Sequence, residues 1–132
     1  MERQNIKGNS PYEAVVGFSR AVKVGPFVTV GGTVATGDDG KIVGGNDMHA
    51  QAVQTLKNIE RALIAAGASL HDVVRTRMFV TDISRWEEAA RAHGEFFRGI
   101  RPAATMLQVV AMVSPEMLVE IEADAIIAAE LR

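Results

Sequence analysis

Three acidic residues, Glu120, Glu122 and Asp124, alternate with apolar residues near the end of the chain. Because successive side chains of a β-strand point to opposite faces, a strand here would place the three carboxylates together on one face. Carboxylates at this spacing repel one another unless they have cationic partners or keep a proton. One interpretation is ion pairing with Arg75, Arg77 or a neighbouring subunit. The other is that one of the carboxylates orients or activates a water molecule.

Other residue types that often carry chemistry do not cluster in the sequence. His49, His71 and His93 have no histidine or cysteine partner at metal-ligand spacing, so we predict no metal site. His93 lies on the apolar stripe of a predicted helix, which favours a hydrogen-bonded core histidine. No serine lies in the context of a nucleophile elbow. Gly31 and Gly32 lack the GxGxxG pattern of a dinucleotide site, and instead allow a ligand or another strand to approach the backbone.

The composition excludes several classes of protein. A chain of 132 residues with 48% hydrophobic and 23% charged residues is typical of one globular domain, here residues 1–132. The net charge of −2 and the pI of about 5.9 offer no basic surface for nucleic acid or an anionic membrane. The absence of cysteine is compatible with a reducing cytoplasm. Without an apolar leader or a run of about 18 apolar residues, we predict a cytoplasmic protein with no membrane partner.

The predicted elements begin with a β-hairpin over residues 15–35, whose Val-rich strands are separated by a Gly-Pro pair. A turn follows at an Asp-Gly pair, which suits backbone with positive φ. The clearest helix spans residues 47–66, with Gly67 as its C-terminal stop. Its polar residues, among them Gln51 and Asn58, are expected to lie away from its apolar side.

A strand is predicted over residues 73–81. One of its faces carries Val74, Thr76, Met78 and Val80, and the other carries Val73, Arg75, Arg77 and Phe79. A second helix is expected to start at a capping box formed by Ser84 and Glu87. Its apolar side carries Trp86, Ala90, His93 and Phe97. The last two strands are expected over residues 103–112 and 118–128.

This order, β-β-(β)-α-β-α-β-β, predicts an α+β fold in which two helices pack on one face of a mixed β-sheet. Two helices cannot cover both faces, so the second face must meet water or another subunit. We expect the carboxylates to share that second face with Phe79 and Met106. A face that mixes paired charges with such apolar residues suits a polar subunit interface that contains a pocket.

Five segments, covering nearly all of the chain, carry a family resemblance: PYEAVVGFSRAVKVGPFVTVGGTVA, QAVQTLKNIERALIAAGASLHDVVRTRMFVTD, HGEFF, RPAAT and VEIEADA. They resemble the YjgF/YER057c/Rid family of reactive-intermediate deaminases, also called endoribonuclease L-PSP proteins. The resemblance implies a chorismate-mutase-like fold and a homotrimer with three ligand pockets between its subunits. The best-known members hydrolyse imines and enamines derived from amino acids and release ammonia, without a cofactor.

The resemblance also implies site residues. Tyr12 matches a tyrosine that follows the N-terminal strand, and Glu120 matches the glutamate that holds the attacking water. Three positions depart from the family pattern. Gly31 stands where a serine is expected, Ala90 where an asparagine is expected, and Ala104 where an arginine grips the substrate carboxylate.

Further pocket positions follow the same resemblance. Met106 occupies a site often held by cysteine, and Phe79 is assigned to the ligand pocket with it. Arg101 is the nearest arginine to the missing one, but it lies three positions before Ala104, roughly 10 Å along an extended segment. Its side chain cannot simply replace one at position 104. The sequence therefore predicts a branch of the family that keeps the pocket and lacks the usual carboxylate-binding arginine.

Three functions are consistent with this pattern. The first is an imine or enamine deaminase, a C–N hydrolase for a non-standard small molecule, in which Glu120 orients the attacking water. The second is a non-catalytic metabolite-binding or regulatory protein, which the substitutions at Gly31, Ala90 and Ala104 favour. The third is RNA cleavage. The acidic pI, the 5% aromatic content and the absence of a catalytic histidine pair argue against it.

Overall fold

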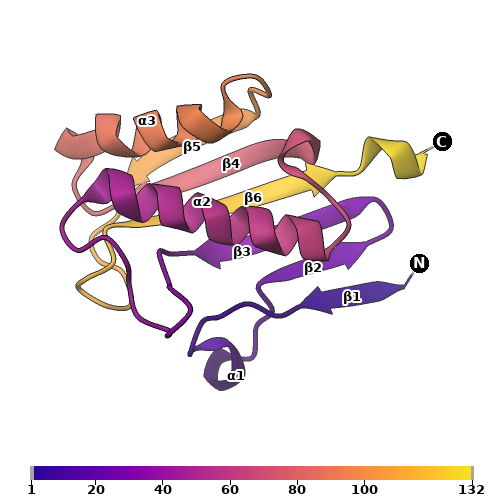
Figure 1. The fold of residues 1–132 in the computed structure, drawn as a ribbon, viewed down its shortest axis with the longest axis horizontal. Helices are drawn as coiled ribbons and strands as arrows, with labels where there is room; N and C mark the ends of the chain where they lie inside the picture. The colour runs from indigo at the N-terminus through magenta and orange to yellow at the C-terminus, as the bar shows by residue number, and fades with distance from the viewer. Residues whose placement is uncertain (1, 132) are drawn as a thin grey trace.

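The computed structural model describes residues 2–131. This part of the chain is built around a mixed six-stranded sheet (Figure 1). In sequence order the strands are β1 (Arg3–Ile6), β2 (Ala21–Val24), β3 (Phe27–Thr33), β4 (Val73–Val80), β5 (Ala103–Gln108) and β6 (Val119–Ile126). Their spatial order is β1-β2-β3-β6-β4-β5. Neighbours are antiparallel except β4 and β5, whose parallel pairing requires a crossover connection.

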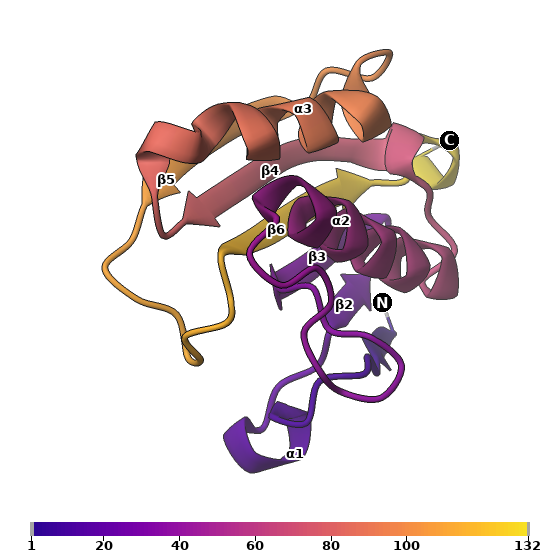
Figure 2. The same ribbon diagram turned by 60° about the vertical axis from the view of Figure 1, so that its left-hand side comes forward.

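Two long helices, α2 (Met48–Ala65) and α3 (Trp86–Phe97), cover the same face of the sheet (Figures 1 and 2). Helix α3 is the crossover between β4 and β5. The short helix α1 (Glu13–Val16) lies away from both of them (Figure 2). Three 3₁₀ turns complete the described elements: Leu70–Asp72, Ile83–Arg85 and Ala128–Leu131. The predicted α+β class, with two helices on one face of a mixed sheet, is confirmed.

The core lies between this sheet face and the two helices. The alternate residues of β6 and its end that were predicted to face the helices are all buried, namely Val119, Ile121, Ala123, Ala125 and Ile127. Leu56, Ile59 and Leu63 of α2 are fully buried as well. Burying one such side chain stabilises the fold by about 1.5–3 kcal/mol. This layer therefore fixes β6 and, with it, the carboxylates on the opposite face of that strand.

Helix α2 begins and ends as the sequence predicts. Asp47 caps its first turn, because the Asp47 carboxylate accepts a hydrogen bond from the Ala50 amide at 3.0 Å. Gly67 follows the helix with φ of +81°, a conformation that glycine adopts without strain.

The prediction for the polar residues of α2 was wrong at two positions, since Gln51 and Asn58 are buried. The Gln51 amide bonds backbone groups of two loops, including the Leu118 amide at 3.0 Å. Asn58 donates to the carbonyls of Val34 and Thr36 at 3.0 and 2.9 Å. These side chains satisfy loop backbone that α2 covers, which periodicity alone does not reveal.

A bulge changes the predicted faces of β4 at its start. The register with β6 shifts between Val73 and Arg75, so Val73 is buried and Val74 is exposed, the reverse of the prediction. One extra residue in a strand moves the preceding side chain to the other face. The predicted faces are confirmed from Thr76 to Val80.

The predicted capping box at Ser84 and Glu87 was wrong. Instead, the Asp82 carboxylate accepts from the Ser84 amide at 3.0 Å and caps the 3₁₀ turn that leads into α3. Arg85 at the end of that turn pairs with Glu88 at 2.6 Å. The capping residue at the entry to α3 is therefore Asp82, two positions before the predicted Ser84.

The chain before β2 departs most from the predicted hairpin. The first strand of the hairpin does not begin at Val15, because α1 and the left-handed residue Gly17 (φ +85°) interrupt the segment. Val15 and Val16 are exposed. No residue range had been predicted for strand β1. Strand β5 was predicted to reach residue 112 but ends at Gln108. Gln108 pairs with Val80, the last residue of the neighbouring strand β4.

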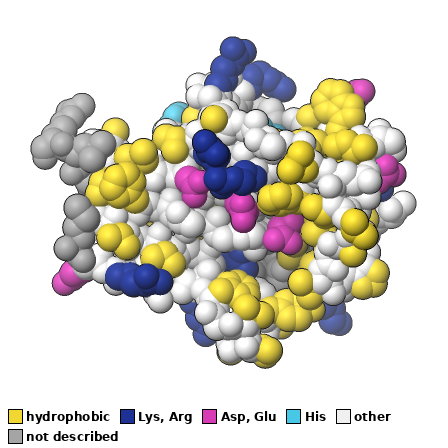
Figure 3. Space-filling view, turned by 180° about the vertical axis from the view of Figure 1, so that it is seen from behind, with side chains coloured by type: hydrophobic (Ala, Val, Ile, Leu, Met, Phe, Trp, Pro, Cys, Tyr) yellow, Lys and Arg dark blue, Asp and Glu magenta, His cyan; other side chains and the backbone are white. Residues whose placement is uncertain are grey.

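The sheet face opposite the helices, called the open face below, carries a charged centre between apolar side chains (Figure 3). Its residues differ from the prediction in one respect. The register of β5 pairs Met78 with Met106 and Phe79 with Leu107, so Met106 lies on the helix side. Phe79 shares the open face with Leu107 instead. The parallel register, which the sequence does not specify, decides this assignment.

Candidate functional site

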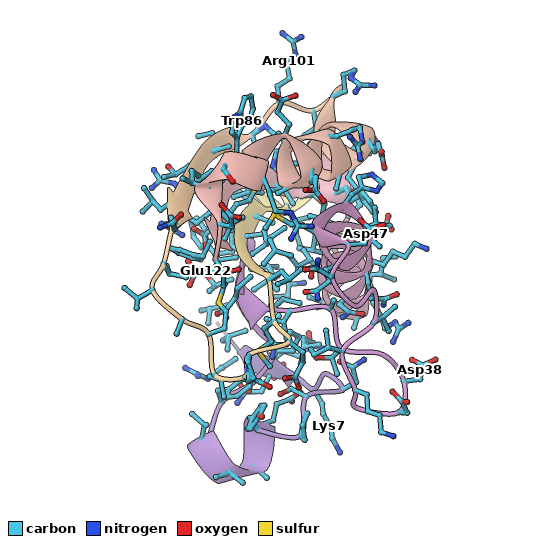
Figure 4. The ribbon with its side chains drawn as sticks, turned by 90° about the vertical axis from the view of Figure 1, so that its left-hand side faces the viewer. Lys7, Asp38, Asp47, Trp86, Arg101 and Glu122 are labelled. Carbon is cyan, nitrogen blue, oxygen red and sulfur yellow. The ribbon has the colours of Figure 1, made fainter. Side chains whose placement is uncertain are left out.

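The three carboxylates of β6 separate into two environments. Arg77 of the neighbouring strand β4 lies 3.2 Å from the Asp124 carboxylate and 3.6 Å from that of Glu122. The ion-pair interpretation is thus confirmed for these two residues. Figure 4 shows Glu122 on the side of the sheet away from α2. Glu120 lies at the other end of the row, opposite Phe79 of β4, and its surroundings are different.

Glu120 lies against an irregular part of β3. The register between β3 and β6 shifts between Val30 and Thr33, which leaves Gly31 and Gly32 outside regular pairing. The Glu120 carboxylate occupies the space beside Gly32, where a β-carbon would collide with its Oε2 atom. A glycine is therefore required at position 32 for this placement of the carboxylate.

Arg20, just before β2, holds the same irregular segment. Its side chain is only 7% exposed. Its guanidinium donates to the Gly31 carbonyl at 3.3 Å, to the Gly32 carbonyl, and to the Thr33 hydroxyl at 3.0 Å. Arg20 was not predicted as a site residue, because its partners are mainly backbone carbonyls that come within reach only once β3 has its bulge. A single arginine inside an apolar hairpin was the available signal.

The environment of Glu120 favours its protonated form. Burial raises the pKa of the Glu120 carboxyl, the negative charge of Glu122 raises it further, and the charge of Arg20 opposes both effects. Burial also lowers the pKa of Arg20, against the attraction of Glu13 and Glu120. A carboxyl group with a raised pKa accepts a proton more readily near neutral pH, as a general base must.

A groove of about 380 Å³ lies between α3 and β5. It is lined by Met78, Ile83, Trp86, Ala90, Ala104, Thr105 and Met106. Its position follows from the register, which puts Ala104 and Met106 on the helix side of β5. None of the lining residues is charged, and the side chain of Thr105, which pairs with Arg77, lies on the open face rather than in the groove. The structure thus brings together three of the positions that the resemblance assigns to the ligand pocket.

The remaining predicted site residues lie elsewhere in the chain. Tyr12, 38% exposed, lines a separate hollow of about 310 Å³ beside Ile42 and Met117. Arg101 projects away from the body of the molecule in Figure 4, and its Nε atom donates to the Arg98 carbonyl at 3.4 Å. It is not among the residues that line the groove. One chain therefore holds the predicted site in separate parts.

His93 is hydrogen-bonded, as predicted, but it is half-buried at the edge of the core rather than within it. Its Nε2 atom lies 2.8 Å from the Thr76 hydroxyl, and its ring packs on Phe97 with centroids 4.7 Å apart. Burial lowers the pKa of His93, so the ring is neutral near pH 7.

Residues 2–131 contain no group of three or more histidine, cysteine, aspartate or glutamate side chains that could hold a metal ion. In the same range, no helix has the length and apolar character needed to cross a membrane.

Comparisons with known proteins agree with this architecture. The fold is that of Rv2704 from Mycobacterium tuberculosis, described as a member of the highly conserved YjgF/YER057c/UK114 family, with a TM-score of 0.85. The two chains are 48% identical, and the match covers 95% of this chain and 99% of that one. YyfA from Yersinia pestis, described as belonging to the conserved Rid protein family, has a TM-score of 0.84 at 30% identity, covering 95% and 99% of the two chains.

Sequence comparison gives the family directly. The RutC family protein PYRAB12510 from Pyrococcus abyssi is 33% identical over 109 residues, which are 82% of this chain and 84% of the relative. The sequence profile of the endoribonuclease L-PSP family matches residues 8–127. The chain therefore belongs to the endoribonuclease L-PSP family, which includes the YjgF and Rid proteins.

Proposed function

We propose that the chain acts as a homotrimer that hydrolyses the C=N bond of a small neutral imine or enamine at a site between subunits. The observation that supports this most is the separation of the predicted site in one chain. Ala90, Ala104 and Met106 line the groove, whereas Gly31 and Glu120 lie together beside the bulge of β3. A second copy that brings its bulge to this groove would complete the site.

The open face supports association of the subunits. Its apolar side chains include Val24, Phe27 and Leu107, and the last two are each 53% exposed in the single chain. They flank the ion pairs of Arg77 with Glu122 and Asp124. Apolar surface beside satisfied charges is typical of subunit interfaces. Three chains of 14.2 kDa give a trimer of 42.6 kDa (3 × 14.2).

The proposed chemistry needs one base and no cofactor. The Glu120 carboxylate accepts a proton from water as the water oxygen bonds to the imine carbon. The proton then passes to the nitrogen and gives a carbinolamine. The hydroxyl proton of this carbinolamine moves to the nitrogen as the C–N bond breaks, so an imine plus water yields a carbonyl compound plus ammonia. The raised pKa of Glu120, caused by burial and by Glu122, suits a group that first takes and then returns this proton.

The groove favours a neutral substrate over an amino-acid imine. A substrate carboxylate needs a cation, and a bidentate arginine provides both charge and orientation. Ala104 stands at the position where the family resemblance expects that arginine, and none of the residues that line the groove carries a positive charge. Met78, Trp86 and Met106 instead offer an apolar surface to the ligand. We propose on this basis that the chain represents a branch without the carboxylate anchor.

Two imines of matched origin test the proposal. A flavin amine oxidase acting on 1-phenylethylamine releases a neutral imine, and an amino-acid oxidase acting on 2-aminobutanoate releases 2-iminobutanoate. We expect the chain to accelerate ketone formation from the first far more than keto-acid formation from the second. Light scattering of the same sample should give the mass of a trimer. A stable monomer at micromolar concentration, or no acceleration with either imine, would contradict the proposal.

The alternative is a non-catalytic metabolite-binding protein that uses the same groove. The observation in its favour is that Gly31, Ala90 and Ala104 all lack the polar side chain that the family resemblance expects. A thermal-shift screen with neutral small molecules separates the two functions. Binding without ammonia release favours the alternative, whereas ammonia release that disappears in Glu120→Gln favours hydrolysis.

A further inference from the structure

We propose that Arg20 is the positioning residue for Glu120, because it holds the β3 bulge against which the carboxylate lies and places a positive charge beside it. This inference rests on the proposed catalytic role of Glu120. It adds a residue to which neither the family resemblance nor the sequence pattern assigns a role.

The first support is the set of hydrogen bonds around the bulge. The Arg20 guanidinium donates to the carbonyls of Gly31 and Gly32 and to the Thr33 hydroxyl, which in turn donates to the Gly31 carbonyl at 2.7 Å. The Arg20 carbonyl accepts from the Gly31 amide at 2.9 Å. One residue thus bonds the bulge through both its side chain and its backbone. It satisfies carbonyls that regular pairing with β6 would otherwise use.

The second support is that the protein holds Arg20 itself in place. The guanidinium lies over the Phe18 ring, with its central carbon 5.1 Å from the ring centroid. At the base of the side chain, a β-carbon at Gly8 would lie only 2.9 Å from the Arg20 β-carbon, so the chain packs closely there. A nearly buried arginine that is packed at both its base and its guanidinium cannot swing out to solvent as an ordinary surface arginine does.

The third support is the charge around Glu120. Arg20 faces it from the start of β2, Glu122 lies along its own strand, and Phe79 is the opposite residue on β4. Arg77 is the next cation on β4, and it bonds Glu122 and Asp124. Glu13 of α1 interacts with Arg20 from the other side.

Arg20 is thus the positive charge that favours the ionised form of Glu120. Its removal would leave burial and Glu122, which both raise the pKa of Glu120. A larger fraction of the carboxyl groups would then be protonated at a given pH, and that fraction could not accept a proton from water.

Arginine and lysine at position 20 should therefore behave differently. The bonds of Arg20 to the bulge all come from its Nη1 atom, which lies one bond farther from the backbone than the ammonium nitrogen of a lysine, whereas the ammonium carries a similar charge. Arg20→Lys should keep the Glu120 pKa near its native value but loosen the bulge. Arg20→Met should lose both effects. Arg77→Met is the matched control, because it removes a cation that bonds the other two carboxylates of the same strand face.

The test is an NMR titration of protein labelled with ¹³C at the glutamate carboxyl groups. The Glu120 signal is identified by its absence in Glu120→Gln. We expect Arg20→Met to move the Glu120 midpoint to higher pH, and Arg20→Lys and Arg77→Met to leave it near native. In the imine assay, kcat of Arg20→Met at about pH 7 should fall about tenfold or more with little change in KM.

The outcomes separate this inference from the proposed function. An unchanged Glu120 midpoint in folded Arg20→Met would overturn the inference, whatever the activity. A shifted midpoint in a protein that hydrolyses no imine would leave Arg20 as the positioning residue and remove the function. If Arg20→Met does not fold, Arg20→Lys decides. Native-like chemical shifts and hydrogen exchange of the Gly31 and Gly32 amides in that variant would contradict the role of Arg20 in holding the bulge.

Discussion

The groove between α3 and β5 and the bulge of β3 are built in opposite ways. The groove is apolar and open, and its walls are a regular helix and a regular edge strand. The bulge is polar and irregular, and Arg20 and Glu120 lie beside it with much of their surface buried. Of the three positions that depart from the residues expected by the family resemblance, Ala90 and Ala104 are in the groove and Gly31 is in the bulge. Under the proposed function, the groove would set selectivity and Glu120 beside the bulge would carry the chemistry.

The largest effect should come from removing the base. Glu120→Gln keeps the shape of the side chain but cannot accept a proton, so we expect kcat to fall about 10²- to 10⁴-fold. Binding of a neutral ligand in the groove should be retained, because the groove lining does not include Glu120. Ligand titration by thermal shift, beside steady-state kinetics, checks both halves. Loss of binding together with turnover would show that the two regions are not separable.

A cation added to the groove should raise activity, unlike the removal of Glu120. Ala104→Arg offers a charge-assisted hydrogen bond of about 1.5–3 kcal/mol to a substrate carboxylate. We expect keto-acid formation from 2-iminobutanoate to rise roughly ten- to a hundredfold if that bond acts in the transition state. Hydrolysis of the neutral imine should not rise with it. A native rate equal to that of an arginine-containing family member would show that Ala104 is no handicap.

The two glycines of the bulge form a matched pair. In Gly32→Ala the new β-carbon would collide with the Glu120 carboxylate, which can move aside only by leaving its place. At Gly31 the nearest atom to an added β-carbon is the Arg20 carbonyl oxygen at 3.6 Å, an ordinary contact. We expect about a tenfold loss of kcat in Gly32→Ala and little change in Gly31→Ala. Equal rates in the two variants would argue against the observed placement of Glu120.

The stability of the protein should report the same carboxylate. Because burial and Glu122 raise its pKa, the folded state binds the Glu120 proton more tightly than the unfolded chain does. The free energy of unfolding therefore falls as the pH rises from the ordinary carboxyl pKa through the raised one. Glu120→Gln should be more stable than the native protein at about pH 8, with a smaller difference at about pH 5. Urea titrations measure both, and a pH-independent difference would contradict the expectation.

The smallest effect concerns Arg101, which has φ of +59° although it is not a glycine. The left-handed conformation costs roughly 1–2 kcal/mol for such a residue. Glycine adopts it without strain, but its greater freedom in the unfolded chain offsets part of that gain. We expect Arg101→Gly to stabilise the protein by about 0.5–1 kcal/mol by denaturant titration. Ligand binding in the groove should stay unchanged. Weaker binding would show that Arg101 belongs to the groove after all.

The sequence predicted the parts of this molecule that depend on a regular period. Helix α2 and strand β6 were placed correctly because each buries one side of a repeating pattern. The errors occur where that period is interrupted or where a partner decides. The bulge before Arg75 reversed Val73 and Val74, and the parallel register moved Met106 to the helix side. Neither the bulge nor the register has a local signature in the chain.

The candidate site was predicted unevenly for the same reason. Ala90, Ala104 and Met106 were assigned by family resemblance, and their shared groove is a property of the folded chain. Glu120 could be identified as one of three carboxylates, but the alternation did not distinguish it from its neighbours. Its distinction comes first from burial beside Gly32, in a bulge whose carbonyls bond Arg20, about a hundred positions away from Glu120 in the chain. Interactions of side chains with distant backbone leave no pattern in composition or spacing.

The position of β5 at the margin of the sheet has a consequence for how such proteins diversify. Ala104 and Thr105 are exposed there and take no part in the core. Substitutions at exposed positions typically change stability by less than about 0.5 kcal/mol. The walls of the groove can therefore accumulate new side chains by drift without endangering folding. Under the proposed function, substitutions at this edge would change which molecules are accepted without disturbing Arg20 and Glu120, which lie outside the groove.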